Sequence, residues 1–295
     1  MHNATKKKIE FLQGYMVKHH KKWFELHSDS IVGLRIDKKN KKGRYSIIFQ
    51  VKKKIGEDSL KKKNIIPKCY KIKFPDGITR MIATDVEQTG IFRFHLQTCK
   101  KPLNNGNIEV GTIGVFLKDS QNIYGLTNYH VVAGDRMANN DFFFNGNDNN
   151  IFVEDQPESF VEGTFSNEID VAFIQLNNHV NTSNTLIDGT TITGYVGGPI
   201  TPQAIGTTIR IYSRINQQAF DRVMSNNAAI FDTGFNNIKM KDIIQSAQPI
   251  TKHGDSGGPV LIDNSILGII VGSDDSYDYI IPFFKIRNFK PLEIL

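Results

Sequence analysis

Cysteine, tryptophan and long apolar runs are all scarce in this chain. Its 295 residues include one tryptophan and two cysteines, Cys69 and Cys99. Two cysteines do not build the dense disulfide framework of a small secreted scaffold, so we expect a reducing environment. One disulfide bridge between the two cysteines stays an alternative. No segment approaches the length of a membrane-spanning helix, and the basic N-terminus lacks the apolar run of a signal peptide. We therefore expect a cytoplasmic protein without a membrane span.

Patterns that bind metals are lacking as well. Neither cysteine belongs to a CxxC pair, and the eight histidines do not show the spacing of metal ligands. The sequence therefore predicts no metal site.

Positive charge is concentrated in the first third of the chain. Residues 1–100 contain 24 Lys+Arg and 9 Asp+Glu, a net +15, whereas the remainder contains 12 and 21, a net −9, and the two add to +6. A basic block such as residues 61–73 can neutralise phosphates without sequence specificity. No aromatic-interleaved binding motif accompanies the lysines, so solvated surface charge is our main interpretation and nucleic-acid binding is an alternative.

The first third also predicts a small α/β region. Apolar residues in the first 25 positions recur at the spacing of an amphipathic helix. β-Branched and aromatic residues then cluster at 30–36 and 45–51, which predicts two strands joined by a polar turn. Further short strands are expected near residues 69–74 and 78–83. We assign residues 1–104 to this basic α/β region.

The pattern changes from about residue 108. Short apolar runs alternate with Gly, Asn, Asp and Pro, and no amphipathic helices of 10 to 15 residues intervene. Parallel strands need such crossover helices, so an antiparallel barrel or sandwich is indicated. Residues 105–295 are therefore predicted to form a second, mostly β domain.

The strongest chemical signal is the octapeptide HGDSGGPV at residues 253–260. Hydrolysis of a peptide through an acyl-enzyme needs a nucleophile on a rigid turn, with backbone N–H groups directed at the developing oxyanion. Gly254 permits a backbone in which its own N–H and that of Ser256 converge. Gly257 and Gly258 keep bulk away from the serine. The alternative is a glycine-rich hairpin turn that carries a solvated serine.

A serine hydroxyl becomes a good nucleophile only when a base removes its proton. The best candidate is His130 in LTNYHVVAG, which follows a predicted strand, and a structural histidine is the alternative. The other histidines lie in the polar N-terminal region, before the barrel, in an Asn-rich loop or too close to the serine: His2, His19, His20, His27, His95, His179 and His253.

The base in turn needs a carboxylate at a buried edge. Asp170 directly precedes the continuous apolar run VAFIQL. Taken alone, it could also be a surface aspartate at a strand start. Asp155 and Asp188 lie in loops without such a strand, so they rank lower.

Taken together, three motifs resemble those of the chymotrypsin/trypsin-like serine peptidases. LTNYHVVAG resembles the histidine motif of that family, IDVAFIQL its aspartate motif and GDSGGPV its serine motif, over about residues 105–285. The resemblance implies two antiparallel six-stranded β-barrels, with His130 and Asp170 on the first and Ser256 on the second. It further implies that these three residues are a catalytic triad, that the Gly254 and Ser256 amides form the oxyanion hole, and that no cofactor is needed.

The motif positions also locate a substrate cleft. In family members that cut after Lys or Arg, the residue six positions before the serine is acidic. Here it is Ile250, so we predict an apolar or small P1 side chain. Motif position adds the edge-strand residues Val271, Gly272 and Ser273 and the pocket-floor residue Tyr279. His253, only three residues from Ser256, is expected to line the same cleft.

The segments IVGLRIDKKNKKGRYSIIFQVKKK and NIIPKCYKIKFPDG resemble a subgroup of trypsin-like proteins from bacteria and plants, among them the plant narrow-leaf protein. Members of that subgroup carry a small α/β region ahead of the peptidase barrels. No cleavage site for an activating N-terminus is visible here, so we expect Asp255 to pair with an internal cation or amide and the enzyme to be competent without cleavage.

These features predict a regulated intracellular serine endopeptidase that cuts a protein partner. The basic N-terminal region would select that partner or mediate assembly into a homo-oligomer. Two alternatives stay open. One is a catalytically inactive trypsin-like binding or scaffold protein, and the other is a nucleic-acid-binding protein that acts through residues 1–100.

Overall fold

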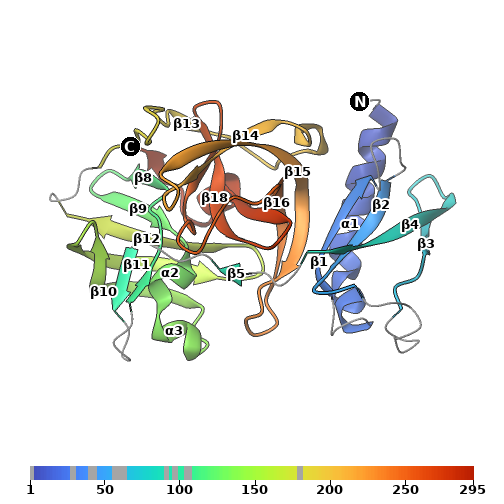
Figure 1. Ribbon diagram of the computed structural model, residues 1–295, viewed down its shortest axis with the longest axis horizontal. Coiled ribbons are helices and arrows are strands. Elements are labelled where there is room, and N and C mark those ends of the chain that lie inside the picture. Colours follow the sequence, from blue (N-terminus) through green and yellow to red (C-terminus); the bar gives the residue numbers. More distant parts are fainter. Residues whose placement is uncertain are drawn as a thin grey trace.

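The chain folds into three successive parts: an α/β region, an eight-stranded sheet and a closed barrel (Figure 1). The computed structural model describes residues 3–26, 31–38, 45–54, 65–89, 93–94, 99–102, 108–177 and 182–295. Over these ranges, no helix combines the length and the apolar character that crossing a membrane requires.

One helix and four strands make up the N-terminal α/β region. They are α1 (Asn3–Leu26), β1 (Ile31–Lys38), β2 (Tyr45–Val51), β3 (Cys69–Lys73) and β4 (Thr79–Gln88). The strands lie in the order β1-β2-β4-β3, with β2 and β4 parallel. Leu12, Met16 and Trp23 on the apolar face of α1 pack with Phe49 of β2 in one buried cluster. The helix and strands expected in this region are confirmed, and Cys69 is a free thiol.

The eight-stranded sheet has the order β20-β8-β9-β12-β11-β10-β6-β7. Its strands are β6 (Cys99–Pro102), β7 (Ile108–Val110), β8 (Val115–Lys118), β9 (Ile123–Thr127), β10 (Phe143–Val153), β11 (Gln156–Phe165), β12 (Asp170–Leu176) and β20 (Glu293–Ile294). Two short helices, α2 (Tyr129–Ala133) and α3 (Asp135–Ala138), follow β9.

Six strands close the barrel in the order β14-β17-β18-β19-β16-β15, with β15 returning to β14. They are β14 (Thr208–Ser213), β15 (Gln218–Asp232), β16 (Lys239–Ala247), β17 (Pro259–Ile262), β18 (Ser265–Ser273) and β19 (Tyr277–Pro282). The smaller elements are β5 (Arg93–Phe94), β13 (Gly194–Tyr195), the 3-10 helix η3 (Pro202–Ala204) and α4 (Phe283–Phe289). Both β5 and β13 pair with β18. The predicted mostly β architecture is confirmed, with one closed six-stranded barrel and a second sheet.

β15 belongs to the barrel and to the N-terminal sheet at once. Its first residues, 218–223, pair with β14, whereas Ile230 and Phe231 pair with β1. The two strands approach closely at Gly33, where a Cβ would lie 2.9 Å from the Ile230 carbonyl oxygen and 2.5 Å from Gln50 Oε1. The N-terminal strands, blue in Figure 1, therefore continue the same sheet as the orange β15 of the barrel.

Candidate active site

The pairing of β9 with β12 brings His130 and Asp170 together. β9 ends at Thr127, whose partner across the ladder is Ala172 near the start of β12. His130 is the second residue of α2, directly beyond β9, and Asp170 is the first residue of β12. Both side chains are buried. Two residues that are 40 positions apart in the sequence therefore meet at one end of the sheet.

Hydrogen bonds orient this pair. Nδ1 of His130 bonds to Oδ2 of Asp170, and the His130 backbone N–H donates to Oδ1 at 3.1 Å. The Asn128 side-chain amide donates to the Asp170 carbonyl oxygen at 2.9 Å. An Nδ1–H that donates to a carboxylate leaves Nε2 with the lone pair that a general base needs. A pair arranged in this way can act as a general base and the carboxylate that orients it.

Ser256 lies in a tight turn between β16 and β17. The Gly257 N–H donates to the Ile270 carbonyl oxygen at 2.8 Å, which fixes the turn to β18. The Ser256 hydroxyl oxygen lies 3.4 Å from the Val271 carbonyl oxygen on the same strand. Ser256 has 0% of its surface exposed, so its hydroxyl is covered in this arrangement.

The same turn packs against the sheet that carries His130. The Thr112 N–H donates to the Ser256 carbonyl oxygen at 2.8 Å. At Gly257, where φ is +87°, a Cβ would lie 2.1 Å from the Thr112 carbonyl oxygen and 2.6 Å from Thr127 Oγ1, so no larger residue fits. Thr127 is three residues before His130. The serine turn thus lies against the strand end that leads to the histidine.

The Gly254 and Ser256 amides have no acceptor among the residues that the structure describes. The Gly258 N–H donates to the Asp255 carbonyl oxygen at 2.8 Å, which directs the Ser256 N–H to the opposite side of that peptide. Gly254 has φ +123°, a conformation that side chains disfavour, and its carbonyl accepts from the Thr112 hydroxyl at 2.7 Å.

Asp255 is fully buried next to the serine and accepts three hydrogen bonds. The donors are the Ser213 hydroxyl at 2.9 Å, the Lys252 N–H at 2.9 Å and the Ile215 N–H at 3.1 Å. Its partners are therefore amides and a hydroxyl of the chain itself. A buried carboxylate that is satisfied in this way holds the turn before Ser256 in place.

Ile250 and the three predicted edge-strand residues lie on two segments beside Ser256. Val271, Gly272 and Ser273 end β18, and the Ser273 hydroxyl donates to the Thr251 carbonyl oxygen at 3.4 Å. Ile250, directly before Thr251, is half-buried. This contact joins the predicted edge strand to the segment that leads to Ser256.

Tyr279 and His253 occupy different surroundings. Tyr279 is buried on β19, and its hydroxyl donates to Asp274 Oδ2 at 2.6 Å, while its ring packs 4.8 Å from that of Phe231. His253 is exposed on the surface before the serine turn. The pocket-floor role predicted for Tyr279 and the lining role predicted for His253 stay predictions.

Two buried carboxylates near the predicted cleft residues, Asp274 and Asp278, were not predicted from the sequence. Asp278 accepts the Thr251 N–H at 3.1 Å, the Thr251 hydroxyl at 2.5 Å and the Ile250 N–H at 3.1 Å. Burial raises the pKa of Asp278, and it raises the pKa of Asp274 to about 6. The signal that could have revealed Asp278 is an acidic residue inside the otherwise apolar strand YDYIIP.

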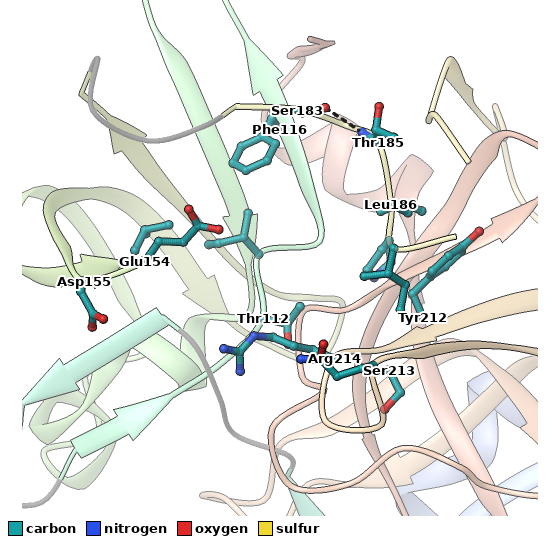
Figure 2. A pocket seen from close by; sticks show the side chains of 15 residues that line it. Thr112, Phe116, Glu154, Asp155, Ser183, Thr185, Leu186, Tyr212, Ser213 and Arg214 are labelled. Carbon is teal, nitrogen blue, oxygen red and sulfur yellow. Dashed lines mark hydrogen bonds between the residues drawn. The ribbon is translucent and has the colours of Figure 1, made fainter. Parts of the chain in front are cut away.

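A pocket of about 400 Å³ lies beside the serine turn, where Thr112 and Ser213 line it (Figure 2). It is lined by Thr112, Ile113, Phe116, Val153, Glu154, Asp155, Ser183, Thr185, Leu186, Ile187, Tyr212, Ser213, Arg214, Gln217 and Pro259. Figure 2 shows Arg214 extending toward the side that carries Glu154 and Asp155. Burial lowers the pKa of Arg214, and the charges of Asp255 and Glu154 oppose that effect. The pocket contains none of the three predicted triad residues, so it is not the predicted substrate cleft.

A metal centre is not apparent either. Within the described ranges, no group of three or more His, Cys, Asp or Glu side chains is placed to hold a metal ion.

The family model of Trypsin matches residues 107–290, which is more than half of the chain, and the chain therefore belongs to this family. The predicted resemblance to chymotrypsin/trypsin-like serine peptidases is confirmed, and the fold is that of a trypsin-like serine protease. The finer resemblance to the subgroup with an N-terminal α/β region stays a prediction. No curated protein matches the chain.

Several solved structures are similar to the chain. A glutamic acid-specific serine protease, described as using a histidine triad in substrate binding, is 13% identical with a TM-score of 0.49, and the match covers 68% of this chain and 98% of that one. The protease NAPase from Nocardiopsis is 12% identical with a TM-score of 0.48, over 68% and 98% of the two chains. The chymotrypsin of Cellulomonas bogoriensis is 15% identical with a TM-score of 0.45, over 62% and 89%.

Proposed function

We propose that the chain is a serine endopeptidase that hydrolyses peptide bonds of protein substrates through an acyl-enzyme on Ser256. The observation that carries the proposal is the buried His130–Asp170 pair at the strand end against which the Ser256 turn packs. A histidine whose Nδ1 is committed to a carboxylate can activate a nearby hydroxyl through Nε2.

Each residue of the proposed triad has one task. His130 takes the proton from Ser256 as the serine oxygen attacks the scissile carbonyl, and then gives that proton to the leaving amine. Asp170 keeps the histidine in the required tautomer and stabilises the imidazolium. The Gly254 and Ser256 amides stabilise the oxyanion, where the loss of one donor typically costs ~100- to 1000-fold in rate. Water then repeats the cycle on the ester.

We propose further that the P1 side chain of the substrate is apolar or small. Ile250 lacks a charge that could pair with a basic P1 residue, and the nearby Asp278 already accepts donors from residues 250 and 251. The Ser273–Thr251 contact also draws together the two segments that flank the nucleophile. In a peptide library, cleavage mainly after Lys or Arg would contradict this specificity.

The wider biological role rests on the sequence. A cytoplasmic location, one protein partner as substrate, selection of that partner by the basic N-terminal region, and homo-oligomer formation all stay predictions. Nucleic-acid binding by residues 1–100 is an untested alternative.

Fluorophosphonate labelling tests the peptidase proposal directly. We expect the folded wild-type protein to gain a single adduct, read by intact mass, because the reagent traps an activated serine. Ser256→Ala should abolish the adduct and His130→Ala should slow its formation strongly. Ser265→Ala, at the far end of β18, is the matched control and should label like the wild type. A folded protein that gains no adduct on prolonged incubation would favour the inactive scaffold instead.

A further inference from the structure

β5 lies on the strand where an extended substrate is expected to bind. Phe94 is paired antiparallel with Gly272, and Arg93 with Ser273. On its other side, this part of β18 pairs with β19, and the pairing of β18 with β17 has already ended at Ile269. The edge left open by β17 is therefore taken by a segment of the same chain. Peptide ligands commonly bind such an edge by adding a strand through main-chain hydrogen bonds.

The direction of β5 is that of a peptide approaching the nucleophile. In the antiparallel register, Phe94 lies opposite Gly272, and the preceding residue of β18 is Val271. The Val271 carbonyl oxygen lies 3.4 Å from the Ser256 hydroxyl oxygen. The carboxyl end of β5 thus points toward Ser256, as the acyl half of a substrate must. The nucleophile meanwhile has no exposed surface.

Contacts of the N-terminal region anchor the chain beside this edge. The Thr89 carbonyl oxygen accepts the Asp275 N–H at 3.0 Å, just beyond the end of β18. Glu87 accepts the Tyr277 hydroxyl at 2.7 Å, and the buried Arg35 donates to Glu87 at 2.9 Å and to the Tyr277 oxygen at 2.8 Å. Docking of the N-terminal sheet on the β18–β19 turn therefore holds Thr89, four residues before β5 in the sequence, beside this edge.

From this arrangement we propose that β5 is an internal substrate mimic, which blocks the cleft until the N-terminal region releases it from β18. Release would open the edge strand to an extended segment of a protein substrate. This inference rests on the proposed peptidase function. It assigns the α/β region a regulatory task in the same molecule, since that region positions the blocking strand.

Proline and alanine at one position separate the backbone pairing from any side-chain effect. The Asp274 N–H donates to the Tyr277 carbonyl oxygen on the β19 side, so the N–H and C=O of the preceding Ser273 face β5, where Arg93 is the residue opposite. Arg93→Pro removes the N–H at this position, whereas Arg93→Ala keeps it. In the full-length chain, we expect Arg93→Pro to raise fluorophosphonate labelling and the hydrolysis of extended peptides at least about tenfold, the effect of losing ~1.4 kcal/mol of pairing. Arg93→Ala should stay near the wild-type rate. Equal rates in all three proteins would overturn the inference.

A reversible crosslink gives a second test that does not depend on a destabilising change. Arg93→Cys and Ser273→Cys, combined with Cys69→Ser and Cys99→Ser, place two thiols at directly opposed positions of the paired strands. The oxidised protein should hydrolyse peptides at least about tenfold more slowly than the same protein after reduction. Unchanged hydrolysis in the protein shown by mass to be crosslinked would overturn the inference.

The two proposals fail in different ways. If every variant labels at the same rate and hydrolyses peptides equally, the peptidase stands and the blocking strand is wrong. If no variant, reduced or released, gains an adduct, the peptidase proposal itself is wrong.

Discussion

Asp255 and Asp278 hold the two ends of the segment that leads to Ser256. Asp278 binds the amides of Ile250 and Thr251 at its start, and Asp255 binds the Lys252 amide and two donors from the β14 end. Buried carboxylates with several donors impose one geometry on the backbone around them. Asp255 could be expected from its place in the serine motif. Asp278 could not, because its partners lie 27 and 28 residues away in the sequence.

The buried carboxyl group of Asp274 should make the stability of the folded protein depend on pH. Burial raises its pKa from the ordinary 3.8 to about 6, although the Tyr279 hydroxyl and two amides act in the opposite direction. Between about pH 4 and pH 6, the folded protein holds a proton that the unfolded chain has lost. The stabilising contribution of this group is therefore fully present below about pH 4 and lost as the pH rises through 6, a change of about 3 kcal/mol in the free energy of unfolding.

The measurement compares wild type with Asp274→Asn, which imitates the neutral acid. Chemical denaturation from about pH 4 to pH 7 should show the wild type losing stability relative to the variant until about pH 6, with a constant difference above it. Curves that run parallel over the whole range would show that Asp274 titrates normally.

Among the secondary-structure elements, the local sequence pattern predicted where strands form but not which strands pair. Periodicity and composition correctly predicted a helix in the first 25 residues and strands at 30–36 and 45–51. The pairing of β1 with β15 joins residues about 200 positions apart in the sequence. A local pattern carries no information about pairing over such a separation. β15 also contains Asn226 and Asn227, although asparagine is typical of turns. The side-chain amide of Asn226 donates to the Ile36 carbonyl oxygen at 3.1 Å and so stabilises the contact between β15 and β1.

In the candidate site, too, local motifs could be predicted from the sequence and the pairing of distant segments could not. The motifs around His130, Asp170 and Ser256 carry their chemistry in short runs of sequence, so each could be proposed from its own neighbourhood. The occupation of the edge strand by β5 could not, because two residues, Arg93 and Phe94, have no periodicity that distinguishes a paired strand from a loop.

A substitution at Gly33 tests the close packing of β1 against β15. A Cβ at this position would lie 2.9 Å from the Ile230 carbonyl oxygen, a backbone atom that cannot move without disturbing the strand pairing. We expect Gly33→Ala to lower the free energy of unfolding by about 1–3 kcal/mol, as overpacking does. Gly14→Ala is the matched control, because an added Cβ on this exposed position of α1 has no atom within 4 Å.

The control should change stability in the opposite direction. Alanine in a helix interior is favoured over glycine by about 1 kcal/mol, so Gly14→Ala should raise the thermal midpoint while Gly33→Ala lowers it. If both substitutions moved the midpoint in the same direction, the close approach at Gly33 would not control the junction.

Across the whole molecule, the α/β region and the barrel are joined by polar as well as apolar contacts. Gln245 of β16 donates to Gln50 of β2 at 3.1 Å, and both side chains are fully buried. Ile230 of β15 packs in the same cluster as the apolar face of α1. Arg35 adds the buried link to Tyr277. Contacts of this kind couple the N-terminal fold to the hairpin that carries the predicted substrate edge.

Such coupling predicts that residues on both sides of the assigned boundary at 104 unfold together. Differential scanning calorimetry of the full chain should show one transition, with calorimetric and van't Hoff enthalpies that agree. Gly33→Ala, which loosens the shared sheet, should lower the ratio of van't Hoff to calorimetric enthalpy or separate a second transition, whereas Gly14→Ala should keep a single one. Two resolved transitions in the wild type would instead mean that the basic α/β region folds on its own, and that its contacts with the β18–β19 turn are too weak to hold β5 on the edge strand.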